Sequence, residues 1–154
     1  MTAVSVGPVA GSKIYIGTTA TSGVGDTYTE IGETAELGEF GREYSEIKSE
    51  SIGDRNVKKF KGTRDDGTMQ ITVNRAAGDA GQAACITAMD SDADYNFKLE
   101  LNDNEYAGLT TPTTFLFKAK VMSYKTKLGG PNNIAQAVIS LGIKSGSITE
   151  TAAV

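Results

Sequence analysis

The sequence predicts a mainly β protein, either a β-sandwich or a partly closed barrel of six to seven strands, with one flanking α-helix and a long loop or arm. Glycine, with 18 of the 154 residues, and threonine are abundant, which favours turns and strands over long helices. Apolar and polar residues alternate in several short segments after residue 57. Only residues 78–89 have the length and the capping signal of a helix. We expect residues 1–154 to form a single domain.

The first half of the chain contains few regular patterns. Residues 1–12 are small and polar and are expected to form an N-terminal arm, and residues 13–17 and 28–31 are expected to be short strands around a loop. Glutamates recur near every third position in residues 33–54, which fits neither strand nor helix. We therefore expect a long, partly extended arm or loop there.

The second half has clearer signals. Residues 57–63 and 69–74 are expected to pair as a hairpin across Asp66-Gly67. Alternation predicts strands at 95–101, 115–127 and 135–143, with residues 129–133 (GGPNN) closing a hairpin between the last two. Residues 145–154 are expected to be a C-terminal tail.

The helix predicted at 78–89 begins with a capping-box spacing. Asp79 is the expected cap, and Gln82 lies three residues on. Ala83, Ile86 and Met89 are expected to form its buried apolar stripe.

The composition excludes several kinds of chemistry. There is no histidine and only one cysteine, Cys85, so thiol–imidazole and zinc sites are excluded, and we expect Cys85 to be a small buried hydrophobe. Residues 90–94 (DSDAD) begin like a calcium loop, but Tyr95 and Leu101 stand where such a loop needs glycine and glutamate. We expect no enzymatic activity and no cofactor. No apolar run is long enough for a membrane anchor.

Charge is divided within residues 30–64. Acids dominate the first part: Glu30, Glu33, Glu36, Glu39, Glu43, Glu46, Glu50 and Asp54, opposed by Arg42 and Lys48. Bases follow: Arg55, Lys58, Lys59, Lys61 and Arg64. The two limbs can face each other on neighbouring copies of the chain, or they can pair within one hairpin or be solvated surface. The net charge of −4 is unfavourable for a general nucleic-acid binder.

Two segments carry a resemblance to a known family. Residues 61–69 (KGTRDDGTM), followed by the helix start at 78–82 (GDAGQ), resemble the major tail tube protein of long non-contractile bacteriophage tails. Residues 117–143, with KVMS at 120–123 and GGPNN at 129–133, resemble the C-terminal hairpin of that family. The resemblance covers roughly residues 57–144.

This resemblance implies a structural protein of the virion tail, made in the cytoplasm of the host bacterium. Its subunits would form hexameric rings that stack into a tube, with a tape-measure protein in the lumen and tail-tip and tail-terminator proteins at the ends. Double-stranded DNA would pass through without specific binding. A long loop at about residues 41–60 would reach a neighbouring ring. The residues expected to make this contact are Arg42, Glu43, Glu46, Glu50, Arg55, Lys58, Lys59 and Lys61.

The polar faces of the later strands are expected to line the lumen, although they can also face outward to solvent. The expected lining residues are Gln70, Thr72, Asn74, Gln136 and Ser140. Lys118 and Lys120 are expected to lie away from it, because a basic wall would retain phosphate.

Two other functions remain open. One is a tube subunit of a contractile tail, a bacteriocin or a type VI secretion system. The other is a β-sandwich module that binds a ligand, with Tyr28, Tyr44 and Tyr106 as an aromatic platform.

Overall fold

The computed structural model describes residues 6–105 and 108–154. The elements in chain order are β1 (Lys13–Ile16), β2 (Thr29–Glu30), β3 (Thr34–Glu36), β4 (Glu43–Ser51), β5 (Asp54–Asp65), β6 (Thr68–Asn74), α1 (Ala80–Met89), β7 (Tyr95–Glu100), β8 (Thr114–Lys127), β9 (Gln136–Ile143) and β10 (Thr149–Thr151). The mainly β class with one flanking helix is confirmed.

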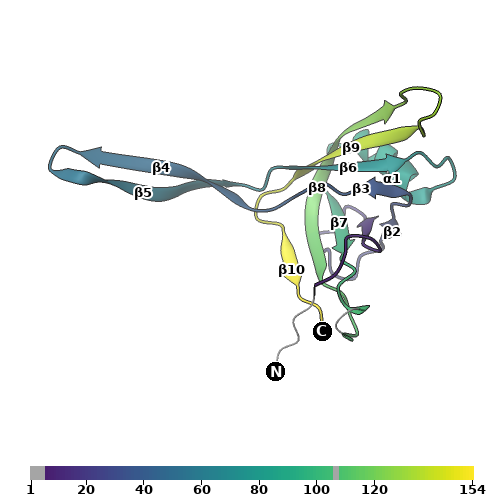
Figure 1. Ribbon diagram of the computed structural model, residues 1–154, viewed down its shortest axis with the longest axis horizontal. Helices are drawn as coiled ribbons and strands as arrows, with labels where there is room; N and C mark the ends of the chain where they lie inside the picture. The colour runs from purple at the N-terminus through teal and green to yellow at the C-terminus, as the bar shows by residue number, and fades with distance from the viewer. Residues whose placement is uncertain (1–5, 106–107) are drawn as a thin grey trace.

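The body of the protein is one antiparallel sheet that curls into a half-barrel (Figure 1). Its strand order is β2-β1-β7-β8-β9-β6-β3, and β10 pairs with β8. β2 and β3 lie at opposite edges of the sheet, yet only residues 31–33 separate them in the chain. The Ile31 amide donates to the Ile14 carbonyl (2.9 Å) and the Asn74 amide to the Glu33 carbonyl (2.8 Å), so this short segment draws the two edges together.

The core fills the inside of this curl. Alternate residues of the sheet point inward and are buried, including Ile14 and Ile16 of β1, Met69, Ile71 and Val73 of β6, Phe97 and Leu99 of β7, and Ala137, Ile139 and Leu141 of β9. This is the inward face that the alternation predicts for β6, β7 and β9.

The helix closes the open side of the curl with small residues. Asp79 caps it, and its carboxylate accepts the Gln82 amide at 2.9 Å. Gln82 does not complete a capping box, because its side-chain amide is used to close the sheet. Its Nε2 donates to the carbonyls of Asn74 (2.9 Å) and Gly32 (3.2 Å), and its Oε1 accepts from the Ala76 amide (3.1 Å).

The apolar stripe predicted for the helix is wrong. Ala83, Ile86 and Met89 are exposed, and the buried residues are Gly81, Gln82, Cys85 and Ala88. The helix lies so close to β2 that a Cβ on Gly81 would be 2.6 Å from the carbonyl carbon of Glu30. Small residues on this face permit that approach, while the strands supply the apolar volume. Cys85 is buried as predicted, and burial raises the pKa of its thiol to about 12.

β4 and β5 form a second, two-stranded sheet that projects from the body as a long hairpin (Figure 1). We call residues 43–65 the arm. The hairpin predicted between 57–63 and 69–74 is wrong, because β5 pairs with β4 while β6 pairs with β9 and β3. Local turn chemistry at Asp66-Gly67 was recognisable, but it does not decide which strands pair over long distances.

The C-terminal segment is ordered against the sheet. Within the predicted tail, β10 pairs with β8, and the Val154 carbonyl accepts the amides of Thr110 (2.7 Å) and Thr111 (2.8 Å). Residues 1–5 of the predicted N-terminal arm lie outside the described residues, and residues 6–11 are exposed. Among the described residues, no helix has the length and apolarity to cross a membrane.

The loop between β1 and β2 is held by Asp26. Burial alone would raise the pKa of its carboxyl, but hydrogen bonds from Asn96 Nδ2 (2.9 Å) and from the amide and hydroxyl of Thr18 (2.7 and 2.6 Å) lower it to about 2. Asn96 is buried, so this loop is tied directly to β7.

Candidate functional site: a projecting arm and a polar sheet face

The arm exposes large apolar side chains. Every residue of β4 is exposed, and so is most of β5. The exposed large apolar residues of the arm are Tyr44, Ile47, Val57 and Phe60 on its strands and Ile52 in the turn between them. Ile47 and Phe60 are direct cross-strand partners, with 52% and 55% of their surfaces accessible. A two-stranded hairpin with one uncovered apolar face is marginally stable in water, so this face is suited to being covered in an assembly.

The two faces of the arm differ in character. Because side chains alternate across a strand, the register puts Ile47 and Phe60 on one face and the pairs Lys48–Lys59 and Glu46–Lys61 on the other. We call these the apolar face and the charged face of the arm.

All eight residues predicted for the ring contact are exposed on the arm or, for Arg42, at its root. Glu43, Glu46 and Glu50 of the acidic limb lie on β4 and the basic limb lies on β5, so these parts of the two limbs oppose each other within one hairpin. Glu46 and Lys59 form an ion pair at 3.4 Å, and Lys61 Nζ lies 5.1 Å from the centre of the Tyr44 ring. The divided charge was expected either to face a neighbouring copy of the chain or to pair within one hairpin. The structure shows pairing within one hairpin. The apolar face was not recognised, because its residues are isolated among charges in the sequence.

The root of the arm contains a buried ion pair. Both oxygens of Asp66 accept from Arg64, with Nε to Oδ1 at 2.7 Å and the terminal guanidinium nitrogen to Oδ2 at 2.9 Å. This pairing holds the pKa of the Asp66 carboxyl below its usual value, and the Asp66 side chain is 0% exposed. The sequence alone suggests only a turn here.

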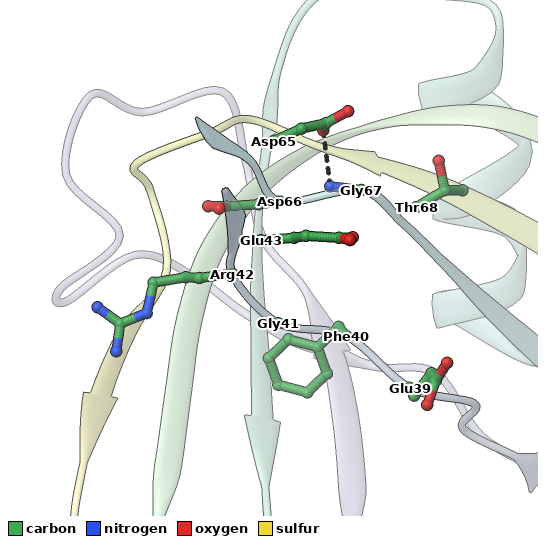
Figure 2. A pocket seen from close by; sticks show the side chains of 9 residues that line it. All are labelled: Glu39, Phe40, Gly41, Arg42, Glu43, Asp65, Asp66, Gly67 and Thr68. Atoms are coloured by element: carbon green, nitrogen blue, oxygen red, sulfur yellow. Dashed lines mark hydrogen bonds between the residues drawn. The ribbon is translucent and has the colours of Figure 1, made fainter. Parts of the chain in front are cut away.

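The segment that leads into β4 contains Phe40, which belongs to an aromatic cluster at the root of the arm. The Phe40 ring lies edge-on to Phe115, with 5.1 Å between ring centroids, and stacks on Phe117 at 5.6 Å. Figure 2 shows the open pocket at this root, in which residues 39–43 face residues 65–68.

The five residues predicted to line a lumen are brought together on one face of the sheet, opposite the core. In β6 and β9, Gln70 is the cross-strand partner of Ser140, and Asn74 is the partner of Gln136. Gln136 Nε2 donates to Asn74 Oδ1 at 3.0 Å. The four strands from which this face was predicted are contiguous in the order β7-β8-β9-β6. We call the side of these strands away from the core the polar face.

The register also puts lysines on the polar face. Lys120 is the partner of Gly142, and a bulge between Val121 and Ser123 reverses the alternation, so that Lys125 and Lys127 lie opposite Val138 and Gln136. A surface that includes Gln136 and Ser140 therefore includes lysines of β8, and the prediction that Lys118 and Lys120 lie apart from such a surface does not agree with the strand register. The bulge has no clear sequence signal.

Two of these lysines have partners nearby. Lys120 forms an ion pair with Asp94 at 3.1 Å and also contacts the Asp92 carbonyl. Lys118 Nζ donates to the Thr21 carbonyl at 2.7 Å. Among the described residues, no group of three or more His, Cys, Asp or Glu side chains is arranged to hold a metal ion.

The tyrosines proposed as a ligand platform are in separate settings. The Tyr28 hydroxyl donates to the Gly23 carbonyl, and its ring lies 5.0 Å from Lys98 Nζ on β7. Tyr44 is on the arm under Lys61, and Tyr106 lies outside the described residues.

Comparison with solved structures identifies the fold. A chain from the SPP1 tail tube aligns with a TM-score of 0.67 and 17% identity, over 94% of this chain and 80% of that one. A chain from the sheath/tube terminator of the extracellular contractile injection system PVC gives 0.71 and 16%, over 96% and 97%. A chain from the anti-feeding prophage baseplate gives 0.73 and 10%, over 99% and 98%.

Comparison by sequence gives no relatives: no protein-family model and no curated protein matches the chain. The likeness is one of three-dimensional structure, and it extends over nearly the whole chain. The chain therefore has the fold of the SPP1 tail tube protein and of chains in contractile injection systems.

Proposed function

We propose that this protein is the structural subunit of a phage tail tube, in which hexameric rings stack around a lumen that conducts double-stranded DNA. The observation that carries the proposal is the fold shared with the SPP1 tail tube over 94% of the chain, in a protein that also projects a bare hairpin arm. Exposed apolar surface on a protruding element is typical of a chain that is completed by copies of itself.

The arm is the proposed contact between rings. Its apolar face would be covered by a neighbouring subunit, and the eight charged residues named above would orient it. A head-to-tail contact of this kind is heterologous and extends into a tube when it repeats along an axis. Six subunits per ring is supported by the six-fold symmetry given for the anti-feeding prophage baseplate.

The polar face of β7-β8-β9-β6 is the proposed lumen wall. Four strands from each of six subunits, spaced ~4.8 Å and tilted ~40°, would close a barrel about 48 Å across. A DNA duplex about 20 Å wide would fit with a layer of water. Because Lys120 is paired with Asp94, the wall would attract phosphate less than its lysines alone suggest.

The proposed location is the virion tail, after synthesis in the cytoplasm of the host bacterium. The proposed partners are further copies of the chain, a tape-measure protein in the lumen, and tail-tip and tail-terminator proteins at the ends. Terminator and cap assemblies are among the structures with this fold.

A specific observation favours a second candidate, the tube subunit of a contractile injection system. The chain covers 97% of the PVC match and 98% of the anti-feeding prophage match, compared with 80% of the SPP1 match. A sheath gene beside the gene for this protein would favour this candidate.

Removal of the arm tests the proposal. Tyr44 and Arg64 are cross-strand partners, so a short Gly-Ser turn can replace residues 45–63 without moving the body. Negative-stain microscopy should show long tubes for the intact protein. The armless variant should keep the circular dichroism of a folded β protein and its melting profile but form no long tubes. Long tubes from the armless variant would remove the arm from the account, and an intact protein that stays monomeric at high concentration would overturn the proposed function.

A further inference from the structure

The arm has a glycine in each of its two connections to the body. A Cβ added to Gly41 would have no other atom within 4 Å, and Gly67 has a φ of 72°. Glycine is the residue with the widest conformational freedom, so a hairpin joined only through these two residues would be able to pivot.

The Arg64–Asp66 pair lies on the arm side of Gly67 and is tied to the body across it. Asp66 Oδ2 accepts the Gly146 amide at 3.0 Å, and the Asp66 amide donates to Ser145 Oγ at 3.2 Å. Gly146 and Ser145 belong to the turn that follows β9, about eighty residues away in the chain. One carboxylate therefore joins the last residues of β5 to a distant part of the body.

That turn is itself fixed to the middle of the sheet. Ser147 Oγ accepts the Lys118 amide at 3.1 Å, and the Lys144 amide donates to the Lys118 carbonyl at 2.8 Å. The contacts form a continuous path from Arg64 on the arm to Lys118 on β8. The Phe40 ring packs against Phe115 and Phe117 of the same strand. Phe40 lies on the body side of Gly41, so its packing holds the chain next to the arm but does not fix the angle of the arm.

We propose that Asp66 is a positioning residue that sets the direction of the arm relative to the sheet. It does so through its bidentate ion pair with Arg64 and its hydrogen bond from the Gly146 amide. This inference rests on the proposed function of the arm as the ring contact. A guanidinium held by both carboxylate oxygens has a fixed orientation, which a single hydrogen bond does not give. An arm held in this way meets the neighbouring ring at one angle.

The direct test measures the spread of arm directions. Spin labels at Ile52→Cys on the arm tip and Thr87→Cys on α1, in a Cys85→Ala background, report one distance within each chain when labelled protein is diluted into excess unlabelled protein. With native Arg64 and Asp66 the distance distribution should be narrow. Asp66→Asn should broaden it at least twofold, because the amide cannot accept from Arg64 and Gly146 with both of its polar atoms.

The matched control is Asp65→Asn. It removes the same charge one residue away, where the carboxylate accepts the Gly67 amide (2.8 Å), a bond that asparagine retains. Its distribution should stay narrow. Arg64→Lys is the alternative variant if Asp66→Asn fails to fold. It keeps the positive charge but cannot form the bidentate pairing, so it should also broaden the distance distribution.

Tube assembly is measured separately on unlabelled variants. Asp66→Asn should form rings or short stacks with a mean tube length reduced at least fivefold, whereas Asp65→Asn should form tubes of native length. A narrow distribution in both Asp66→Asn and Arg64→Lys, or a broad one accompanied by tubes of native length, would overturn the inference. Long tubes from the armless variant would instead count against the arm as the ring contact, while the spin-label distances would still report whether Asp66 fixes its direction.

Discussion

Replacing Ile47 and Phe60 together by serine should weaken tube growth strongly without unfolding the body. The two side chains are cross-strand partners on the arm, and about half of each is accessible in the free chain. Full burial of a side chain of this size contributes about 1.5–3 kcal/mol, so covering the exposed half contributes roughly 0.75–1.5 kcal/mol for each residue. The pair would thus supply roughly 1.5–3 kcal/mol to each subunit addition.

This free energy translates into a measurable concentration. Since 1.4 kcal/mol corresponds to a factor of ten, the critical concentration for tube formation should rise roughly 10- to 140-fold. Sedimentation of tubes at a series of protein concentrations gives this value directly. The melting temperature of the unassembled protein should change little, because both residues lie outside the core.

The matched comparison replaces Lys48 and Lys59, the neighbouring pair on the charged face of the arm. The two lysines carry like charges, and Lys59 is already paired with Glu46 in its own chain. An exposed ion pair formed with a neighbouring subunit would contribute about 0.2–1 kcal/mol, so serine at both positions should raise the critical concentration by about fivefold. If the charged pair costs as much as the apolar pair, or if neither change affects assembly, the apolar face does not form the contact.

Three further outcomes are expected. Gly81→Ala should lower the free energy of unfolding by about 1–3 kcal/mol, seen as a fall of roughly 2–12 °C in melting temperature, because its Cβ would meet the backbone of Glu30 and Ile31. Gly78→Ala, which has open space, should be nearly neutral, and a stabilised Gly81→Ala would show that the helix does not lie against β2. The Asp26 carboxyl has a pKa of about 2 in the folded protein, below its unfolded value, so its stabilising contribution is present above pH 4 and is lost as the pH falls toward 2. Asp26→Asn should therefore flatten the pH dependence of the free energy of unfolding between pH 4 and 2. An unchanged slope would show that Asp26 does not cause that pH dependence. Assembled tubes should bind duplex DNA no tighter than micromolar at physiological salt in a fluorescence anisotropy titration, and tighter binding that weakens steeply with salt would mean that Lys125 and Lys127 make the lumen basic.

Much of the body could be predicted from the sequence, because a strand with one buried face leaves a period of two. The segments around Phe97, Phe117 and Ile139 alternate in this way, and each is a strand of the sheet. The arm strands have no such signal, since both of their faces are exposed and their apolar residues need not alternate.

Other features depend on packing that the sequence does not record. The helix buries Gly81, Gln82 and Cys85, so its inward face consists of small and partly polar residues. The apolar periodicity of the sequence instead predicts burial of the face with Ile86 and Met89, which is exposed. Asp66 has the local chemistry of a turn, but its importance comes from Gly146, eighty residues later. Contacts between distant segments of this kind cannot be inferred from spacing along the chain.

Cryo-electron microscopy of the purified protein at high concentration tests the central claim most directly. Hollow tubes of stacked rings are expected, with six subunits per ring, the polar face of β7-β8-β9-β6 toward the lumen and the arm of each subunit covered by its neighbour. Particles that remain single chains, or tubes in which the arm stands free in solvent, would contradict the account.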